Sequence, residues 1–235
     1  MALPKPTRPE YSTTIPSTGK KIKYQAFTVR EEKVLVLAAE SENNDEIASA
    51  IENVLSKCVT APVDFKVRDL ALFDIEYLFL KARAKSIGEK IELRITDPND
   101  PSYTTEHSLN IDSIKVKKDS KHTDLVEIDE DTKIKMRYPG LDFFAEGLKI
   151  DTIGESLETI AECVSSIVIG EEVYNRADMT AEEVIEWLEA LTSEQFGRLM
   201  EFFRTMPKLT HTIKLHNPTT GNDFEIVLTG LADFF

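Results

Sequence analysis

The sequence has few cysteines and no long apolar run, and both absences exclude whole classes of protein. Cysteine occurs twice among 235 residues, at Cys58 and Cys163, which is too few for a disulfide framework. The longest clean apolar stretch, residues 34–39, falls far short of the roughly 18 residues that a membrane span needs. Residues 1–10 lack the apolar core of a secretory signal. We therefore expect a protein of a reducing compartment that has no membrane partner.

Basic side chains are outnumbered by acidic ones. The chain has 28 Lys and Arg against 42 Asp and Glu, which gives a formal net charge of −14 and a pI near 4.8. Sequence-independent binding to nucleic acid needs a basic face that displaces counterions, so we expect no nucleic-acid partner. Hydrophobic residues make up 41% of the chain, which is enough for one large domain or two small ones.

Short alternating segments between amphipathic stretches predict an α+β fold, in which helices pack with small antiparallel hairpins and sheets. Thr28 and Glu31 have the spacing of a capping box and mark one helix start. The expected strands are 11–15, 22–27, 89–96, 103–111, 114–116, 125–128, 133–137, 210–215 and 224–228. The expected helices begin after Thr28 and after Asn43 or Asn44, and continue with 72–88, about 154–168, 180–191 and 192–207.

The chain is expected to consist of a flexible Pro-rich arm and two halves. Residues 1–10 hold three of the ten prolines, and the halves cover residues 11–140 and 141–235. Each half has an amphipathic helix, an aromatic-rich helix and a hairpin with a ribbon-like knuckle turn. Two sequence echoes pair Ile47–Cys58 with Ile160–Val168 and Ile95–Asp100 with Leu215–Gly221. Such echoes also arise by chance in α+β chains, so duplication and coincidence both remain open.

No group of residues has the pattern of a catalytic or cofactor site. Gly19-Lys20 suggests a phosphate-binding loop, but that motif needs glycine where Thr14 stands, and it needs a helix directly afterwards. A strand is expected there, so the segment is interpreted as a hairpin turn. Both cysteines continue apolar stripes and are interpreted as buried structural thiols. No evident nucleophile lies beside the histidines, which are His107, His122, His211 and His216. We expect no enzymatic activity and no cofactor.

The two knuckle turns have the shape of zinc-ribbon turns but not their ligands. Zinc in such turns is held by four nitrogen or sulfur atoms, typically from Cys-x-x-Cys pairs. Asp97 and Asp100 have that spacing but offer hard oxygen atoms, and His216 has no cysteine beside it. Acidic runs at residues 129–131 and 182–183 lack the spacing of a calcium loop and are interpreted as solvated surface. We therefore expect no bound metal.

Four blocks of the sequence, in order, carry a resemblance to a known family. They are Ile15–Lys33 (IPSTGKKIKYQAFTVREEK), Leu72–Lys81 (LFDIEYLFLK), Lys85–Glu89 (KSIGE) and Leu231–Phe235 (LADFF). The chain resembles the T4-type bacteriophage baseplate hub proteins, a family that includes the hub assembly factors of contractile tails. Some members carry cysteines in the knuckle turns, where this chain has Asp97, Asp100 and Asn217. This departure argues against a metal but not against membership of the family.

The resemblance implies a role in building the hub of a phage tail baseplate in the host cytoplasm. The chain would act as an assembly chaperone that binds other hub subunits, or it would remain in the virion as a permanent structural subunit. The partners implied are other baseplate hub and tail proteins, and no catalytic residue is implied. High net charge keeps a free protein soluble, which favours the assembly factor.

A basic region near the N-terminus is the candidate partner-binding site. Five basic residues fall within the first 23 positions and are opposed by one acid, Glu10. Such an asymmetry would steer association with an acidic surface. A second candidate is the aromatic tail, which docks either on the chain's own core or on a partner. The candidate residues are Lys5, Arg8, Lys20, Lys21, Lys23, Phe234 and Phe235. Alternatively, the lysines only form the polar face of an exposed hairpin.

Overall fold

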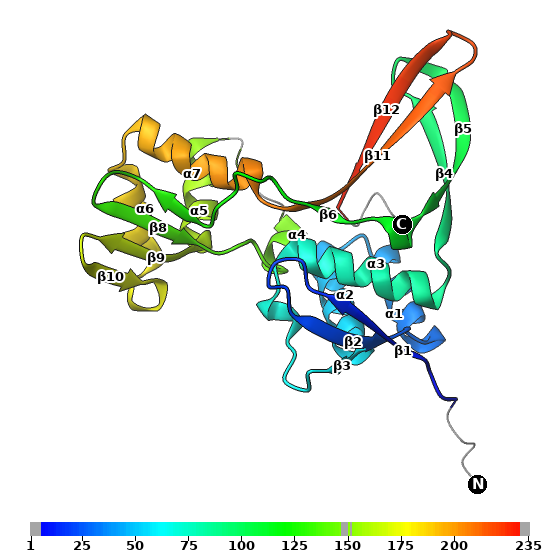
Figure 1. Ribbon diagram of the computed structural model, residues 1–235, viewed down its shortest axis with the longest axis horizontal. Coiled ribbons are helices and arrows are strands. Elements are labelled where there is room, and N and C mark those ends of the chain that lie inside the picture. Colours follow the sequence, from blue (N-terminus) through cyan, green and yellow to red (C-terminus); the bar gives the residue numbers. More distant parts are fainter. Residues whose placement is uncertain (1–5, 147–149, 151, 231–235) are drawn as a thin grey trace. The chain divides into compact units, whose positions relative to one another are not determined.

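The structure is an α+β fold, which confirms the predicted class. The computed structural model describes residues 6–146, 150 and 152–230 of the chain. Figure 1 shows helices next to several small sheets, and the strands in these sheets pair antiparallel. None of the helices in these residues is long and apolar enough to cross a membrane.

Contacts along the chain define two compact units. Unit 1 comprises residues 1–117 and 208–235, and unit 2 comprises residues 118–207. This division differs from the predicted halves, which met between residues 140 and 141, because the last hairpin groups with the first part of the chain. Strand β11 (Lys208–Asn217) pairs with β6 (Val116–Lys117), and this pairing attaches the hairpin to unit 1.

Within its described residues, unit 1 contains small antiparallel sheets with strand orders β1-β2-β3, β4-β5 and β12-β11-β6. The strands not yet given are β1 (Glu10–Thr14), β2 (Lys21–Gln25), β3 (Val59–Ala61), β4 (Lys90–Asp97), β5 (Asp100–Asn110) and β12 (Asn222–Thr229). The helices are α1 (Val29–Glu40), α2 (Asn44–Cys58) and α3 (Leu72–Ser86), with short 3-10 helices η1 (Val67–Asp69) and η2 (Ile111–Ser113). The predicted capping box of Thr28 and Glu31 forms at the start of α1.

Helix α3 is the centre of unit 1, because it is buried along most of its length. Ile75 and Phe79 are fully buried, and the Phe79 ring stacks on Phe27 with centroids 6.4 Å apart. Two carboxylates on the same helix, Asp74 and Glu76, are buried as well. A buried charge is costly unless hydrogen-bond donors surround it. The helix therefore also determines where the groups that donate hydrogen bonds to these carboxylates must lie.

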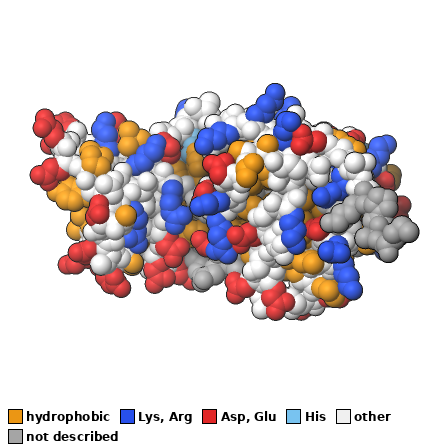
Figure 2. Space-filling model, turned by 90° about the horizontal axis from the view of Figure 1, so that it is seen from below, with side chains coloured by type: hydrophobic (Ala, Val, Ile, Leu, Met, Phe, Trp, Pro, Cys, Tyr) orange, Lys and Arg blue, Asp and Glu red, His pale blue; other side chains and the backbone are white. Residues whose placement is uncertain are grey.

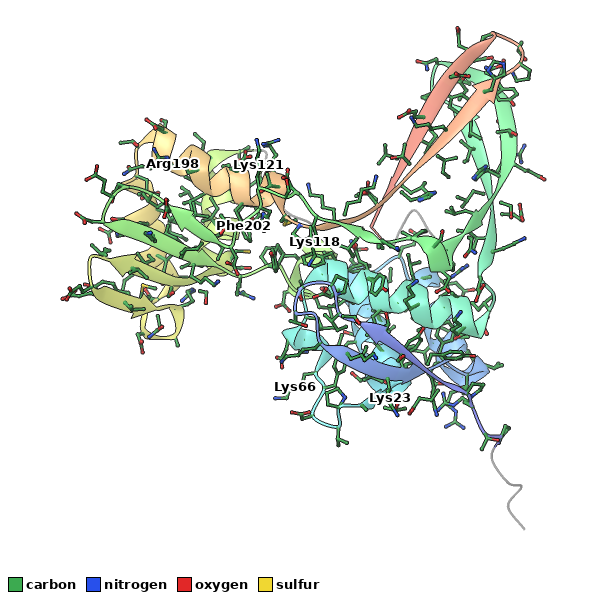
Figure 3. The ribbon with its side chains drawn as sticks, in the orientation of Figure 1. Lys23, Lys66, Lys118, Lys121, Arg198 and Phe202 are labelled. Atoms are coloured by element: carbon green, nitrogen blue, oxygen red, sulfur yellow. The ribbon has the colours of Figure 1, made fainter. Side chains whose placement is uncertain are left out.

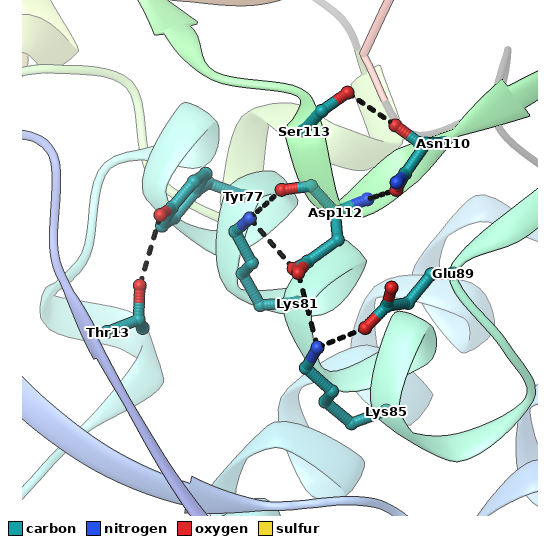
Figure 4. A network of polar contacts seen from close by, with 8 residues as sticks. All are labelled: Thr13, Tyr77, Lys81, Lys85, Glu89, Asn110, Asp112 and Ser113. Carbon is teal, nitrogen blue, oxygen red and sulfur yellow. Dashed lines mark hydrogen bonds and ion pairs between the residues drawn. The ribbon is translucent and has the colours of Figure 1, made fainter.

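An ion network joins α3 to the base of the β4–β5 hairpin (Figure 4). Lys81 and Lys85 approach the Asp112 carboxylate with N–O distances of 3.0 and 3.2 Å, and Lys85 also pairs with Glu89. Burial alone would raise the pKa of Asp112, but the two ammonium groups outweigh it and lower that pKa below its usual value. The hydrogen bond to Glu89 raises the pKa of Lys85. Asp112 and Lys85 are therefore charged at neutral pH, and the network holds the hairpin base on the helix.

A buried asparagine joins the two knuckle turns of unit 1, on the hairpins that lie side by side in Figure 1. The Asn217 amide donates to Asp97 Oδ2 at 2.8 Å and to Asp100 Oδ2 at 3.1 Å. Asn217 is fully buried and Asp97 is 2% exposed. Within each turn, the first side chain accepts a backbone N–H two residues on, Asn99 for Asp97 and Thr219 for Asn217. Hydrogen bonds therefore both close the turns and tie them together.

Unit 2 is built on one sheet of its described residues, with strand order β10-β9-β8-β7. The strands are β7 (Leu125–Glu127), β8 (Thr132–Met136), β9 (Val164–Ile169) and β10 (Glu172–Asn175). The helices are α4 (Asp142–Glu146), α5 (Ile153–Cys163), α6 (Ala181–Glu189) and α7 (Ser193–Thr205), with the 3-10 helix η3 (Arg176–Asp178). Thr180 and Thr192 cap α6 and α7 in capping boxes, which confirms the predicted helix starts.

The predicted helix at 154–168 is wrong over its last part. Helix α5 ends at Cys163, and strand β9 follows without a loop. Val164 and Ile167 are both buried although they are three residues apart, because the register of the β8–β9 pair shifts within this segment. Because of this shift, the buried residues of the strand are three positions apart, which is the spacing expected of the buried face of a helix. The β-branched residues of the segment favour the strand.

The two units repeat one order of elements. Each begins with a hairpin and continues with two helices, a strand and a 3-10 helix, with the additional strand β10 before the 3-10 helix in unit 2. Further helix and a second hairpin follow along the chain, β4–β5 after α3 and β11–β12 after α7. In each unit the second helix ends at a cysteine and the next strand begins at a valine, at Cys58-Val59 and Cys163-Val164. The echo predicted between Ile47–Cys58 and Ile160–Val168 aligned the two segments by their first residues. The structure instead aligns Cys58 with Cys163, so the predicted alignment is out of register.

The strand pairings of the two units repeat as well. Strand β2 pairs with β3 as β8 pairs with β9, and both pairings break register at the same point. Lys23 lies opposite Ala61 in unit 1, and Lys135 lies opposite Ser166 in unit 2. A shared irregularity is a more specific likeness than a shared order of elements, because bulges are local insertions. The likeness of the two units thus extends to this register break.

His122 in unit 2 is enclosed by an aromatic cluster. Its ring stacks on Tyr138 with centroids 5.6 Å apart and lies 5.1 Å from the Phe202 ring. Its Nδ1 is 2.9 Å from Thr205 Oγ1, and its Nε2 is 3.0 Å from the Tyr138 hydroxyl. The Thr205 hydroxyl donates to a backbone carbonyl, so we assign the ring proton to Nδ1. Burial lowers the pKa of His122.

Replacing Asn217 by alanine should separate the two hairpins of unit 1. The change leaves the buried Asp97 Oδ2 without its donor, so we expect the free energy of unfolding to fall by about 2 kcal/mol. Hydrogen exchange at the backbone amides of the two knuckle turns should become faster, while exchange in unit 2 stays the same. His216→Ala, at an exposed neighbour on the same strand, is the control. Equal exchange in both variants would show that the amide does not join the hairpins.

Acid should destabilise unit 2 through His122. The folded-state pKa lies below the unfolded value near 6.5, so its contribution is complete above that value and is lost as pH falls towards the folded pKa. Asp124 and Asp119 oppose the effect of burial without cancelling it. Urea unfolding followed by Trp187 fluorescence should show this loss between about pH 7.5 and about pH 5. His122→Gln should reduce the pH dependence, and an equal slope in that variant would contradict the assignment.

Candidate functional site

A groove runs along the exposed face of the β1-β2-β3 sheet in unit 1. Its volume is about 790 Å³, which is within the range of ligand-binding clefts. One wall is the β1–β2 hairpin, and the other is the segment 61–70 that follows β3. Figure 3 labels one lysine on each wall, Lys23 on β2 and Lys66 on the opposite segment.

A buried carboxylate holds the hairpin turn at one end of the groove. Asp74, in the first turn of α3, is fully buried and accepts both the Ser17 backbone N–H, at 2.9 Å, and the Ser17 hydroxyl. Gly19 has φ +69°, which a side chain would disfavour, and its N–H donates to the Ile15 carbonyl at 2.9 Å. Strand β2 follows immediately, so the turn is the predicted hairpin turn and does not have the geometry of a phosphate-binding loop.

Four lysines line the groove, and they are Lys20, Lys21, Lys23 and Lys66. Lys23 pairs with Glu10 at 2.8 Å, and this hydrogen bond raises the pKa of Lys23 and lowers that of Glu10. The other three ammonium groups are exposed and form no ion pair with any residue that the structure describes. Asp64 and Asp69 are the acids of the lining. The groove therefore has an excess of positive charge in an acidic protein.

Apolar side chains lie under the floor and along the second wall of the groove. Ile15 and Ile22 are almost completely buried beneath the floor, so the apolar side chains that stay accessible to a partner are Phe65 and Leu70, which are half-buried on the second wall. Figure 2 shows the molecule from the side on which Lys23 and Lys66 lie in Figure 3, and on it basic and apolar side chains are neighbours. The groove thus offers apolar contact flanked by positive charge.

The structure brings together three of the predicted partner-binding residues, Lys20, Lys21 and Lys23, on one hairpin. Arg8 is not part of a free arm, since its guanidinium donates to the Ala26 carbonyl at 2.8 Å. Strand β1 also begins at Glu10, so the predicted flexible segment 1–10 is too long at its C-terminal end. Lys5, Phe234 and Phe235 lie outside the described residues, and so does the predicted docking of the aromatic tail.

Sequence reasoning missed Lys66, which completes the groove. This lysine lies more than forty positions after Lys21, and only the pairing of β2 with β3 places its segment beside the hairpin. No local motif marks it. Phe65 beside it was missed for the same reason. Lys66 and Phe65 become part of the groove only through the tertiary structure, so the sequence alone does not reveal them.

Cys58 and Cys163 are both enclosed by the cores of their units. Burial raises the pKa of the Cys58 thiol to about 11 and that of Cys163 to about 12, so both stay protonated and unreactive at neutral pH. Both cysteines are buried, as predicted. No group of three or more His, Cys, Asp or Glu side chains that could hold a metal ion occurs in the part of the chain that the structure describes.

Comparison with known proteins places the chain in context. The family model described as "T4 bacteriophage base plate protein" matches residues 8–235, a range that includes both units and the whole lysine-lined groove. No curated protein and no solved structure matches the chain significantly.

Removing the Ser17 hydroxyl should loosen the turn at the end of the groove. Ser17→Ala deletes one of the two hydrogen bonds from Ser17 to the buried Asp74 carboxylate, so we expect the free energy of unfolding to fall by about 1–2 kcal/mol. The Gly19 amide should also exchange faster with solvent. Ser12→Ala, on the exposed side of the same hairpin, is the control. If both variants lose the same stability, Asp74 does not anchor the turn.

Proposed function

Because the chain belongs to the family of T4 bacteriophage base plate proteins, its role lies in the baseplate of a phage tail, and we propose that it is an assembly factor that binds other subunits of the baseplate hub. The observation that carries this proposal is the groove of unit 1, where exposed lysines flank an apolar floor. Such a surface suits a polypeptide partner. We place this action in the host cytoplasm, where tail proteins meet before the tail is complete.

The charge of the chain supports an assembly factor that is free for part of its life. A net charge of −14 keeps a separate protein soluble and monomeric. Subunits in permanent complexes usually bury larger and more apolar interfaces. An assembly factor needs only a local contact that forms and dissociates, and a groove of about 790 Å³ is of that kind.

A permanent structural subunit of the hub is the second candidate. It is favoured by apolar side chains on α1, where Val29, Val36 and Leu37 are 80%, 50% and 54% exposed. Only Ala38 of this helix is buried. A permanent neighbour in the baseplate would cover these side chains and remove their contact with water.

The proposal includes the absence of enzymatic activity. The most plausible competing class is a nucleotide-binding protein, because Gly19-Lys20 resembles part of a phosphate-binding motif. The direct test is a nucleotide-binding assay with Lys20→Ala as its control. Saturable binding that is lost in the variant would overturn this part of the proposal.

Mass spectrometry of purified tails should separate the two candidates. For an assembly factor we expect the protein to be absent from finished tails, or present well below the copy number of the hub subunits. A phage that lacks the protein should then accumulate unassembled hub subunits. Stoichiometric copies in mature tails would decide for the structural subunit instead.

A further inference from the structure

We propose that the groove of unit 1 binds an acidic segment of a partner polypeptide, whose apolar side chains enter the groove between Lys21 and Lys66. This inference rests on the proposed function, because it names the kind of surface by which a hub partner is held. It adds a chemical class of partner and a place for it on this chain.

The likeness of the two units supplies an internal comparison for the groove. Strand β2 contains Lys21-Ile22-Lys23, and the corresponding strand β8 contains Lys133-Ile134-Lys135. In both strands the isoleucine is buried in the core and the two lysines lie on the other face of the sheet. The same fold therefore presents the same pair of cations twice, in two different surroundings.

In unit 2 both of these cations are neutralised within the sheet. Lys133 pairs with Glu127 at 2.7 Å, and Lys135 pairs with Asp124 at 2.7 Å. Glu127 lies directly opposite Lys133 in the β7–β8 register. Cross-strand pairs of opposite charge stabilise a sheet, so this arrangement needs no partner.

In unit 1 the corresponding acid is missing. Thr14 lies opposite Lys21, in the place that Glu127 takes in unit 2, and Lys21 has no ion pair with any described residue. Lys23 still pairs with Glu10. Of the two lysines that correspond between the units, only Lys21 of unit 1 is thus without an ion pair among the described residues, and it lines the groove.

The wall that closes the groove also differs between the units. In unit 2 the chain after β9 turns back as β10 and extends the sheet. In unit 1 β3 ends at Ala61, and the next residues bring Phe65 and Lys66 to the groove instead of forming a further strand. Unit 1 therefore has an apolar and cationic wall at the place where unit 2 has a strand.

An acidic polypeptide fits these features better than a nucleic acid does. The lysines match carboxylates, while the half-buried Phe65 and Leu70 match apolar side chains between them. A nucleic acid extends its phosphates well beyond a groove of this size, over a chain whose net charge is −14. A short acidic segment stays within the groove, so its carboxylates are not repelled by the acidic surface outside it.

The first experiment compares two charge reversals in the full chain, co-expressed with the other baseplate hub subunits of the same phage. Lys21→Glu with Lys66→Glu changes the groove, and Lys133→Glu with Lys135→Glu changes net charge equally at the corresponding strand of unit 2. Circular dichroism and thermal unfolding check that each variant folds. We expect the groove variant to slow association about tenfold or more at low salt and the control to stay near wild type. Lys21→Arg with Lys66→Arg should restore association.

The second experiment identifies what the lysines touch. A water-soluble carbodiimide forms an amide bond only between an amine and a carboxylate in direct contact. In the wild-type complex we expect mass spectrometry to find Lys20, Lys21 or Lys66 joined to Asp or Glu of a hub subunit. Crosslinks from these lysines to another copy of the same chain would overturn the proposal, because the occupant would then be a second copy.

The outcomes separate the groove from the proposed function. If hub subunits bind the wild type and the groove variant equally well, the groove proposal is wrong and the assembly role stands. If no hub subunit binds, the assembly role fails, and a fluorescein-labelled peptide of alternating Glu and Leu tests the groove alone. Binding of that peptide, lost in the groove variant and in the matched Gln–Leu peptide, supports the groove. Preference for a labelled single-stranded oligonucleotide, or binding of neither probe, overturns it.

Discussion

The contact between Asp74 and Ser17 is the constraint on which the groove depends. A fully buried carboxylate on the central helix of unit 1 needs donors, and the hairpin turn supplies a backbone N–H and a hydroxyl from one residue. The helix thereby sets the position of the turn, the turn sets the register of β1 and β2, and β2 carries Lys21 and Lys23 outward. A polar group in the core thus determines the placement of charges on the surface.

Local signals in the sequence were sufficient for most elements but not for every boundary. The capping box at Thr28 and the helix starts at Thr180 and Thr192 are predicted from the sequence, because capping chemistry involves residues only three apart. The end of α5 at Cys163 was missed because a register shift gives β9 an apolar spacing like that of a helix. The groove was half predicted: its hairpin lysines were visible as a basic cluster, but Lys66 joins them only through the β2–β3 pairing.

The likeness of the two units shows how one fold can present both a surface whose charges are paired and a candidate binding surface. Each unit needs one face of its sheet to bury a core, and the other face is free to vary. In unit 2 that face is balanced by Glu127 and Asp124, which pair with the two lysines of β8. In unit 1 one acid is replaced by Thr14 and a strand by the wall that carries Lys66.

A net charge of −14 does not prevent unit 1 from attracting an acidic partner. At physiological ionic strength the Debye length is about 8 Å, so charges farther away than this are largely screened. A carboxylate entering the groove is within contact distance of the unpaired lysines and is attracted mainly by them. A longer polyanion would extend beyond the screened region over the acidic surface. In the proposed complex, screening therefore favours a short acidic segment, because such a segment stays close to the lysines and far from most of the acidic surface.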